Sequence, residues 1–127
     1  MEVLLVDDQP VTVQVYAALV RKTFSGARVH VAVALPEALQ IAAGRALDLV
    51  LLDIGLPACD GIDALERFRK EFPAIPVLVV SASEDQGRIK ACLDAGARGY
   101  LPKRAAVENL PAAMKIVADG GRYVSMR

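Results

Sequence analysis

The sequence contains no tryptophan, one histidine and only two cysteines, Cys59 and Cys92. The cysteines are far apart and form no CxxC pair, which excludes the disulfide framework of a small secreted domain and indicates free thiols in a reducing compartment. The single histidine, His30, lies in a strand-like segment. We therefore expect neither a disulfide nor a catalytic histidine.

Long hydrophobic runs and an excess of charge of either sign are also absent. The longest apolar runs, such as residues 47–52, are far shorter than the roughly 20 residues that span a bilayer. Residues 1–8 carry neither a basic region nor a cleavage site, so we expect a cytoplasmic protein without membrane contact. With 15 basic and 15 acidic residues, the chain lacks the uncompensated positive charge with which a domain binds nucleic acid directly.

What the sequence does contain is a set of short apolar runs rich in valine, isoleucine and leucine, within the 127 residues typical of one domain. The runs are continuous rather than alternating, which is typical of parallel strands buried on both faces. They lie at residues 3–6, 28–33, 47–52, 77–80 and 99–101. Segments of helical periodicity separate them, at residues 10–24, 35–44, 62–72 and 84–95.

Terminal signals delimit the last two predicted helices. Acidic residues at 84 and 85 suit a helix N-terminus, and Gly96 suits its C-terminal cap. A fifth helix is predicted to end at Asp119, before Gly120. Since proline fits a helix only near its start, Pro111 predicts that this helix begins late, around residue 108 or 109.

Five alternations of strand and helix predict an α/β fold, a doubly wound five-stranded parallel sheet with helices on both faces. We expect the flavodoxin-like (βα)5 arrangement with strand order 2-1-3-4-5. Ligands of such sheets bind outside the carboxyl ends of the strands. The notable polar residues all fall at those ends: Asp7, Asp8, Asp53, Ser81 and Lys103.

Three carboxylates at one edge require a positive partner, since each like-charge pair costs on the order of 4 kcal/mol at about 4 Å and an effective dielectric near 20. Lys103 offsets part of this repulsion, and Mg²⁺ with its preference for carboxylate oxygen and water would offset the rest. The first turn, Asp7 to Pro10, is no glycine-rich phosphate loop, which disfavours nucleotide binding. A carboxylate beside Mg²⁺ and an ammonium group is a plausible nucleophile toward a phosphoryl group.

These residues resemble a known family. Four motifs carry the resemblance: Val6-Asp7-Asp8-Gln9-Pro10; Leu52-Asp53-Ile54-Gly55-Leu56-Pro57 with Asp60-Gly61; Ser81-Ala82-Ser83; and Gly96-Ala97-Arg98-Gly99-Tyr100-Leu101-Pro102-Lys103. In order and spacing they resemble the receiver domain of bacterial two-component response regulators over nearly the whole chain. The surroundings of the first and last motifs, with residues 118–124, resemble the NarL/LuxR type, which precedes a helix-turn-helix output domain.

The resemblance implies that Asp53 is the phosphoacceptor, taking a phosphoryl group from a sensor histidine kinase. It implies that Asp8, with Asp7 partly through water, binds Mg²⁺ together with Asp53 and the backbone carbonyl of Gly55. The protein would then be a phosphoprotein that works as a signalling switch and not as an enzyme of multiple turnover. Its output would be a shift between conformations.

The resemblance assigns three further roles. Lys103 would pair with the phosphoryl group, Ser81 would be the switch hydroxyl, and Tyr100 would be the aromatic residue that turns inward when Ser81 moves toward the phosphate. Many receivers place a cis proline after this lysine, whereas here Arg104 follows it and Pro102 precedes it.

Residues 1–121 would form the receiver domain, and residues 122–127 a tail or the start of a linker to a DNA-binding domain. A natural single-domain regulator stays open as an alternative, and receivers of this type can form homodimers. Two other functions also stay open. One is an aspartyl-phosphate phosphohydrolase, although Gly55 stands where such enzymes carry a second aspartate. The other is a receiver-like interaction domain that works without phosphorylation.

Overall fold

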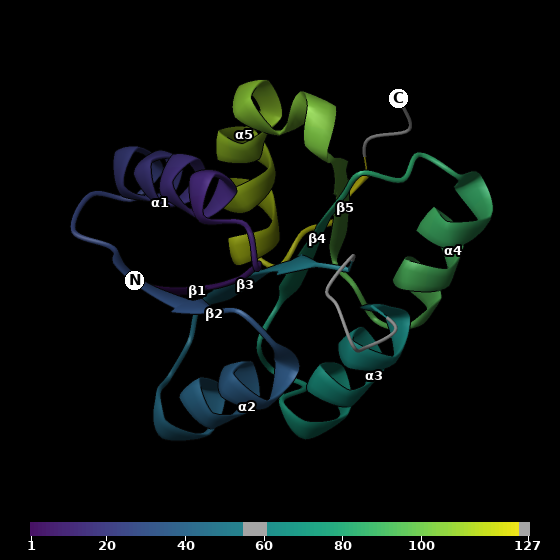
Figure 1. Ribbon diagram of the computed structural model, residues 1–127, viewed down its shortest axis with the longest axis horizontal. Coiled ribbons are helices and arrows are strands. Elements are labelled where there is room, and N and C mark those ends of the chain that lie inside the picture. Colours follow the sequence, from purple (N-terminus) through teal and green to yellow (C-terminus); the bar gives the residue numbers. More distant parts are fainter. Residues whose placement is uncertain (55–60, 125–127) are drawn as a thin grey trace.

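The computed structural model describes residues 1–54 and 61–124, along which strands and helices alternate (Figure 1). The strands are β1 (Glu2–Val6), β2 (Arg28–Ala32), β3 (Leu49–Asp53), β4 (Val77–Ser81), β5 (Gly99–Pro102) and β6 (Tyr123–Val124). The helices are α1 (Pro10–Thr23), α2 (Leu35–Gly44), α3 (Gly61–Glu71), α4 (Gln86–Asp94) and α5 (Ala106–Ala118), with the 3₁₀ turn η1 (Lys103–Ala105) before α5. None of these helices, within the two described stretches, is long and apolar enough to cross a membrane.

All strands are parallel, in the order β2-β1-β3-β4-β5-β6. The predicted order 2-1-3-4-5 is confirmed, but the predicted count of five strands is too low. The sixth strand lies within the segment predicted as a tail or linker. The backbone N–H of Tyr123 donates to the carbonyl of Arg98 at 3.1 Å, so β6 satisfies backbone groups that an edge strand would otherwise leave to water.

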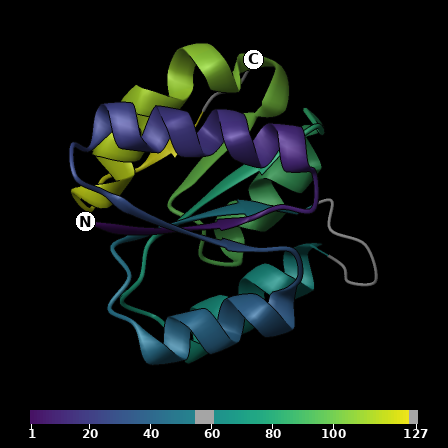
Figure 2. The ribbon, with the colours of Figure 1, turned by 60° about the vertical axis from the view of Figure 1, so that its left-hand side comes forward.

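Helices cover both faces of the sheet, as predicted (Figure 2). Because side chains alternate along a strand, Val3 and Leu5 of β1 pack with α1 and α5, whereas Leu4 and Val6 pack with the opposite layer. That opposite layer consists of α2, α3 and α4. β3 and β4 are buried along their whole length, which explains their continuous apolar sequence.

Helix α5 begins at Ala106, and the prediction of a later start is wrong. Pro111 lies inside this helix, where its missing N–H leaves the carbonyl of Val107 without its usual partner. Val107 is largely exposed, so water can take that hydrogen bond. Burial of Leu110 and Met114 in the core holds the helix in place, and this burial outweighs the cost of the proline.

The ends of α4 largely follow the signals in the sequence. The side chain of Asp85 accepts a hydrogen bond from the backbone N–H of Arg88 at 2.9 Å, which caps the N-terminus. The helix therefore begins at Gln86, two residues later than predicted, because Glu84 and Asp85 precede it. Beyond the other end, Gly96 has a φ of +108°, the left-handed conformation for which glycine is suited. These ends place the first turn of α4 beside the carboxyl end of β4.

Candidate functional site

Four predicted residues meet at the carboxyl edge of the sheet. Asp7 follows β1, Asp53 ends β3, Ser81 ends β4 and Lys103 follows β5. The pairing of neighbouring strands brings their ends together, with Val6 opposite Leu52 and Ser81 opposite Pro102. Asp7, Asp53 and Ser81 are only 4%, 6% and 4% exposed. Burial of polar groups to this extent costs free energy unless they have hydrogen-bond or charge partners.

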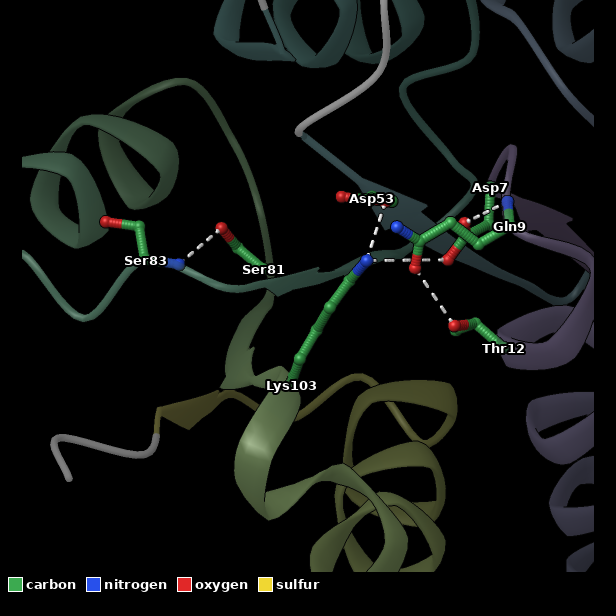
Figure 3. Close-up of polar contacts among 7 residues, drawn as sticks. All are labelled: Asp7, Gln9, Thr12, Asp53, Ser81, Ser83 and Lys103. Atoms are coloured by element: carbon green, nitrogen blue, oxygen red, sulfur yellow. Dashed lines mark hydrogen bonds and ion pairs between the residues drawn. The ribbon is translucent and has the colours of Figure 1, made fainter.

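The central contact of the site joins Lys103 to Asp53 (Figure 3). The Nζ atom of Lys103 lies 2.9 Å from Oδ2 of Asp53 and 3.9 Å from Oδ2 of Asp7. One ammonium group thus stands between two buried carboxylates. It reduces their mutual repulsion, and it directs one carboxylate oxygen of Asp53 toward a positive charge.

Asp7, Asp8 and Asp53 form an acidic cluster in which one ligand atom from each residue lies within 4.8 Å of the others. Burial raises the pKa of Asp7, and the negative charges of Asp53 and Asp8 act in the same direction. The hydrogen bond from the backbone N–H of Gln9, 2.9 Å from Oδ1, and the charge of Lys103 oppose this rise without cancelling it. Burial thus makes the charged form of Asp7 costly at this site.

The donor set of this cluster fits a hard divalent cation. Carboxylate oxygens are ligands that Mg²⁺ prefers, together with several waters. Asp7 and Asp53 are buried, whereas Asp8 is exposed, so one side of the cluster is open to solvent. Gly55, whose backbone carbonyl is predicted to complete the set, lies outside the described residues.

The hydroxyl of Ser81 and the ring of Tyr100 are linked through Ser83. The Oγ atom of Ser81 accepts a hydrogen bond from the backbone N–H of Ser83 at 3.1 Å, which leaves the hydroxyl proton available to a ligand. Tyr100 is fully buried, and its hydroxyl donates to the carbonyl of Ser83 at 2.6 Å. One residue of the β4–α4 loop thus contacts both residues that the family resemblance assigns to the switch.

The loop after Lys103 differs from the family pattern of a cis proline after the lysine. No cis peptide bond occurs in residues 1–54 and 61–124. The chain instead enters η1, and Arg104 turns toward the β4–α4 loop. There its Nη2 and Nε atoms lie 2.6 Å and 2.8 Å from Oε1 of Glu84. An exposed ion pair therefore ties the two loops that flank the site.

A cavity of about 380 Å³ opens above the carboxylates. It is lined by Asp8, Gln9, Asp53, Ser81, Ala82, Ser83, Arg88 and Lys103. Arg88 reaches the cavity from the first turn of α4 and is not among the residues predicted from the sequence. Its position four residues after Glu84 in the predicted helix was the only available signal, and that signal specifies no ligand.

Tyr16 is a second residue that the sequence analysis missed. This residue of α1 lies beneath the carboxylates, against a small space that it shares with Asp7 and Asp53. Burial, with the negative charges of these two residues, raises the pKa of its hydroxyl to about 12. Helical periodicity alone would place Tyr16 in the core, and only the fold shows that it borders the site.

Two residues that the sequence analysis set aside lie away from this edge. The Nε2 atom of His30 in β2 is 2.6 Å from Oε1 of Glu2, at the opposite end of β1 from Asp7. Cys92 is buried in the α2, α3 and α4 layer. Cys59 lies outside the described residues.

Comparison with known proteins agrees with this geometry. Residues 3–115 match the family model described as response regulator receiver domain. The transcriptional regulatory protein MctR of Rhizobium johnstonii is 32% identical over 126 residues, which cover 98% of this chain and 58% of that protein. The transcriptional activator protein ExaE of Pseudomonas putida is 34% identical, with coverage of 98% and 58%. The chain thus spans a little over half the length of these relatives.

Solved structures share the fold. A LuxR family DNA-binding response regulator from Silicibacter pomeroyi superimposes with a TM-score of 0.86 at 32% identity, covering 98% of this chain and 97% of that one. The isolated REC domain of RcsB from Salmonella enterica, with the phosphomimetic BeF3-, has a TM-score of 0.89 at 19% identity and coverage of 98% and 93%; at that identity the match shows the fold alone. From the family match over residues 3–115 and the identity to MctR, this chain belongs to the response regulator receiver domain family.

Proposed function

We propose that Asp53 is the phosphorylated residue of a signalling switch and that a sensor histidine kinase supplies the phosphoryl group. The contact of 2.9 Å between Lys103 Nζ and Asp53 Oδ2 carries this proposal, because it places a carboxylate nucleophile and a cation together at the cavity. A carboxylate oxygen of Asp53 forms a bond to phosphorus. The P–N bond to the kinase histidine breaks, and the released imidazole nitrogen takes up a proton.

The residues around Asp53 stabilise the charge that this transfer moves into the site. Lys103 would shift its contact from the free carboxylate to an oxygen of the phosphoryl group, and Ser81 would donate its hydroxyl proton to another. Asp7, Asp8 and Asp53, with the carbonyl of Gly55, would bind Mg²⁺. When bound, that ion supplies positive charge that favours in-line transfer.

The output of the transfer is a change of conformation. A phosphoryl group adds about 1.5 to 2 negative charges and strong hydrogen-bond acceptors. If Ser81 turns toward these acceptors, its bond to the N–H of Ser83 is weakened, and Ser83 also holds Tyr100. Phosphorylation would thereby shift the populations of the conformations that the β4–α4 loop and Tyr100 adopt.

The remainder of the regulator is proposed from its relatives. Residues 1–121 would be the receiver domain, and residues 122–127 would lead toward a helix-turn-helix DNA-binding domain. The relatives MctR and ExaE carry names of transcriptional regulators, and each is longer than this chain. We propose a cytoplasmic regulator that acts as a phosphoacceptor and can form a homodimer.

Intact mass spectrometry tests the proposal. The chain is incubated with Mg²⁺ and acetyl phosphate, and we expect a gain of one phosphoryl group in wild type and none in Asp53→Asn. An equal gain in both proteins, or none in wild type, would contradict the proposal. Multiple turnover on phosphomonoesters would instead support a phosphohydrolase, and absence of Mg²⁺ binding would support an interaction domain that works without phosphorylation.

A further inference from the structure

We propose that Arg88 forms an anion-binding subsite beside Asp53, which binds the phosphate of the incoming phosphodonor. The inference rests on the proposed phosphorylation of Asp53 and adds a residue from α4 to that reaction. It starts from the cavity of about 380 Å³, in which Arg88 is the only lining residue that α4 contributes.

The balance of charge in the cavity leaves Arg88 available. Among the described residues, four charged ones line it: Asp8, Asp53, Arg88 and Lys103. Lys103 already pairs with Asp53 and also lies 3.9 Å from Asp7. The residue Arg88 is half-buried, and its guanidinium, by contrast, makes no ion pair or hydrogen bond with any residue in the described part of the chain. A guanidinium that borders a cavity and has no carboxylate partner is suited to an anionic ligand.

A series of hydrogen bonds connects the backbone of Arg88 to the side chain of Ser81. The N–H of Ser83 donates to Oγ of Ser81 at 3.1 Å, and the N–H of Asp85 donates to Oγ of Ser83 at 3.2 Å. The N–H of Arg88 then donates to Oδ2 of Asp85 at 2.9 Å. The base of the Arg88 side chain is therefore fixed relative to the switch hydroxyl, which limits where its guanidinium can lie.

A phosphodonor needs such a group because its phosphate must approach an acidic cluster. Lys103 is bound to the nucleophile, so it offsets the charge of Asp53 before it can bind the donor. A guanidinium presents parallel N–H groups that match two phosphate oxygens. Arg88 would bind the donor phosphate during approach, whereas Lys103 would bind the phosphoryl group once the new bond forms.

Acetyl phosphate provides a defined reaction for the test. A carboxylate oxygen of Asp53 forms a bond to phosphorus, the bond from phosphorus to the bridging oxygen breaks, and acetate leaves with the electron pair. No proton or further reactant is needed. The rate at low donor concentration reports donor binding together with transfer, so the loss of a donor-binding group lowers it.

We expect Arg88→Gln to lower the apparent second-order rate constant for phosphorylation of Asp53 on the order of tenfold, which corresponds to ~1.4 kcal/mol. Intact mass measured over time, at several concentrations of acetyl phosphate with saturating Mg²⁺, provides the rate. Arg88→Lys should retain more of the rate than Arg88→Gln because it keeps the charge. Phosphoramidate, which carries less negative charge than acetyl phosphate, should show a smaller loss.

Lys90→Gln is the matched control. It removes the same charge from α4, but Lys90 is 77% exposed and pairs with Asp94 at 2.9 Å, and it does not line the cavity. Its rate should equal that of wild type. Affinity for Mg²⁺ should be unchanged or higher in Arg88→Gln, because the lost charge is positive.

Three results would overturn the assignment of Arg88: a wild-type rate in Arg88→Gln, an equal loss in Lys90→Gln, or a weaker affinity for Mg²⁺ in Arg88→Gln, which would indicate distortion of the acidic cluster. Each of these leaves phosphorylation of Asp53 in place in wild type. Failure of wild type to gain a phosphoryl group would overturn the proposed function, and the role of Arg88 with it.

Discussion

Lys103 and Arg104 are neighbours in the sequence, and each forms a close ion pair, but the two pairs differ in their surroundings. Lys103 reaches inward to Asp53 at 2.9 Å, with side chains that are 22% and 7% exposed. Arg104 reaches sideways to Glu84 at 2.6 Å, with side chains that are 57% and 45% exposed. Distance alone would rank the second pair as the stronger.

Solvent reverses that ranking. An exposed pair is screened by water, and ordering its two flexible side chains costs entropy. In the buried pair, loss of one partner leaves a charge that water solvates poorly. The comparison indicates that the inner contacts of this edge determine stability and chemistry, while the outer pair only adjusts the loops.

Replacement of Lys103 should have the largest effect. Loss of one partner of a buried pair costs ~3–5 kcal/mol, and because Lys103 keeps 22% exposure, we expect Lys103→Met to lose about 2–3 kcal/mol of unfolding free energy. Urea denaturation without divalent metal measures this loss. The double variant with Asp53→Asn removes both charges and should recover most of it. If it recovers nothing, the loss does not come from the charge of Asp53 that Lys103 offsets.

Asp7→Asn should have a smaller effect of opposite sign, because it removes a buried carboxylate from the acidic cluster. Near neutral pH we expect it to stabilise the metal-free protein, at the lower end of the ~1–4 kcal/mol range for like charges 4 Å apart. Burial raises the pKa of Asp7 in the folded state. Wild type therefore gains stability as the pH falls through that raised pKa, and the advantage of the variant shrinks in acid.

Thermal unfolding of both proteins across a pH series checks this prediction. The variant should also bind Mg²⁺ more weakly, because it loses a charged ligand. A variant less stable than wild type at neutral pH would show that the attraction between Asp7 and Lys103, whose charged atoms lie 3.9 Å apart, outweighs the cost of burying the Asp7 carboxylate.

Tyr100→Phe should cost about 1 kcal/mol, the usual contribution of one hydrogen bond. The substitution removes the donation to the carbonyl of Ser83 at 2.6 Å and keeps the ring in the core. Chemical denaturation measures the cost. A spectroscopic probe on the β4–α4 loop should show faster or larger motion in the variant, and an unchanged loop would show that the Tyr100 hydroxyl does not hold Ser83 in place.

The smallest effect is expected for the exposed ion pair of Arg104 and Glu84. Glu84→Gln should leave the unfolding midpoint within measurement error of wild type, and added salt should erase any remainder. The hydrogen bond to Arg104 lowers the pKa of Glu84. Any contribution is therefore present above the ordinary pKa of a glutamate, about 4.3, and is lost as the pH falls through the lowered value. A loss of unfolding free energy comparable with that of Lys103→Met would show that exposure to water does not distinguish the two ion pairs.

Much of this edge could be predicted because parallel strands end together. Continuous apolar runs predicted five strands, and the residue at or after the ends of four of them identified Asp7, Asp53, Ser81 and Lys103. The roles of these residues in phosphorylation stay predictions. Local sequence signals predicted correctly those features that depend only on neighbouring residues. Gly96, with a φ of +108°, is one example, since it follows the C-terminal end of α4 as predicted.

Prediction failed where distant packing outweighs a local rule. Pro111 disfavours a helix locally, yet α5 continues through it because Leu110 and Met114 are buried against the sheet. The sixth strand has only two residues, too few for a pattern, and it exists because β5 offers it a free edge. Arg88 and Tyr16 approach the carboxylates from helices whose rotation no sequence motif specifies.

The sequence by itself determined the order of strands and helices and placed the acidic residues at strand ends, because hydrophobic periodicity and turn residues act over a few neighbours. Only the tertiary structure decided which charges are buried. Lys103 and Arg104 show this most directly, since adjacent basic residues look alike in sequence. The path of η1 turns one toward Asp53 and the other toward Glu84, and exposure to water then sets what each contact contributes.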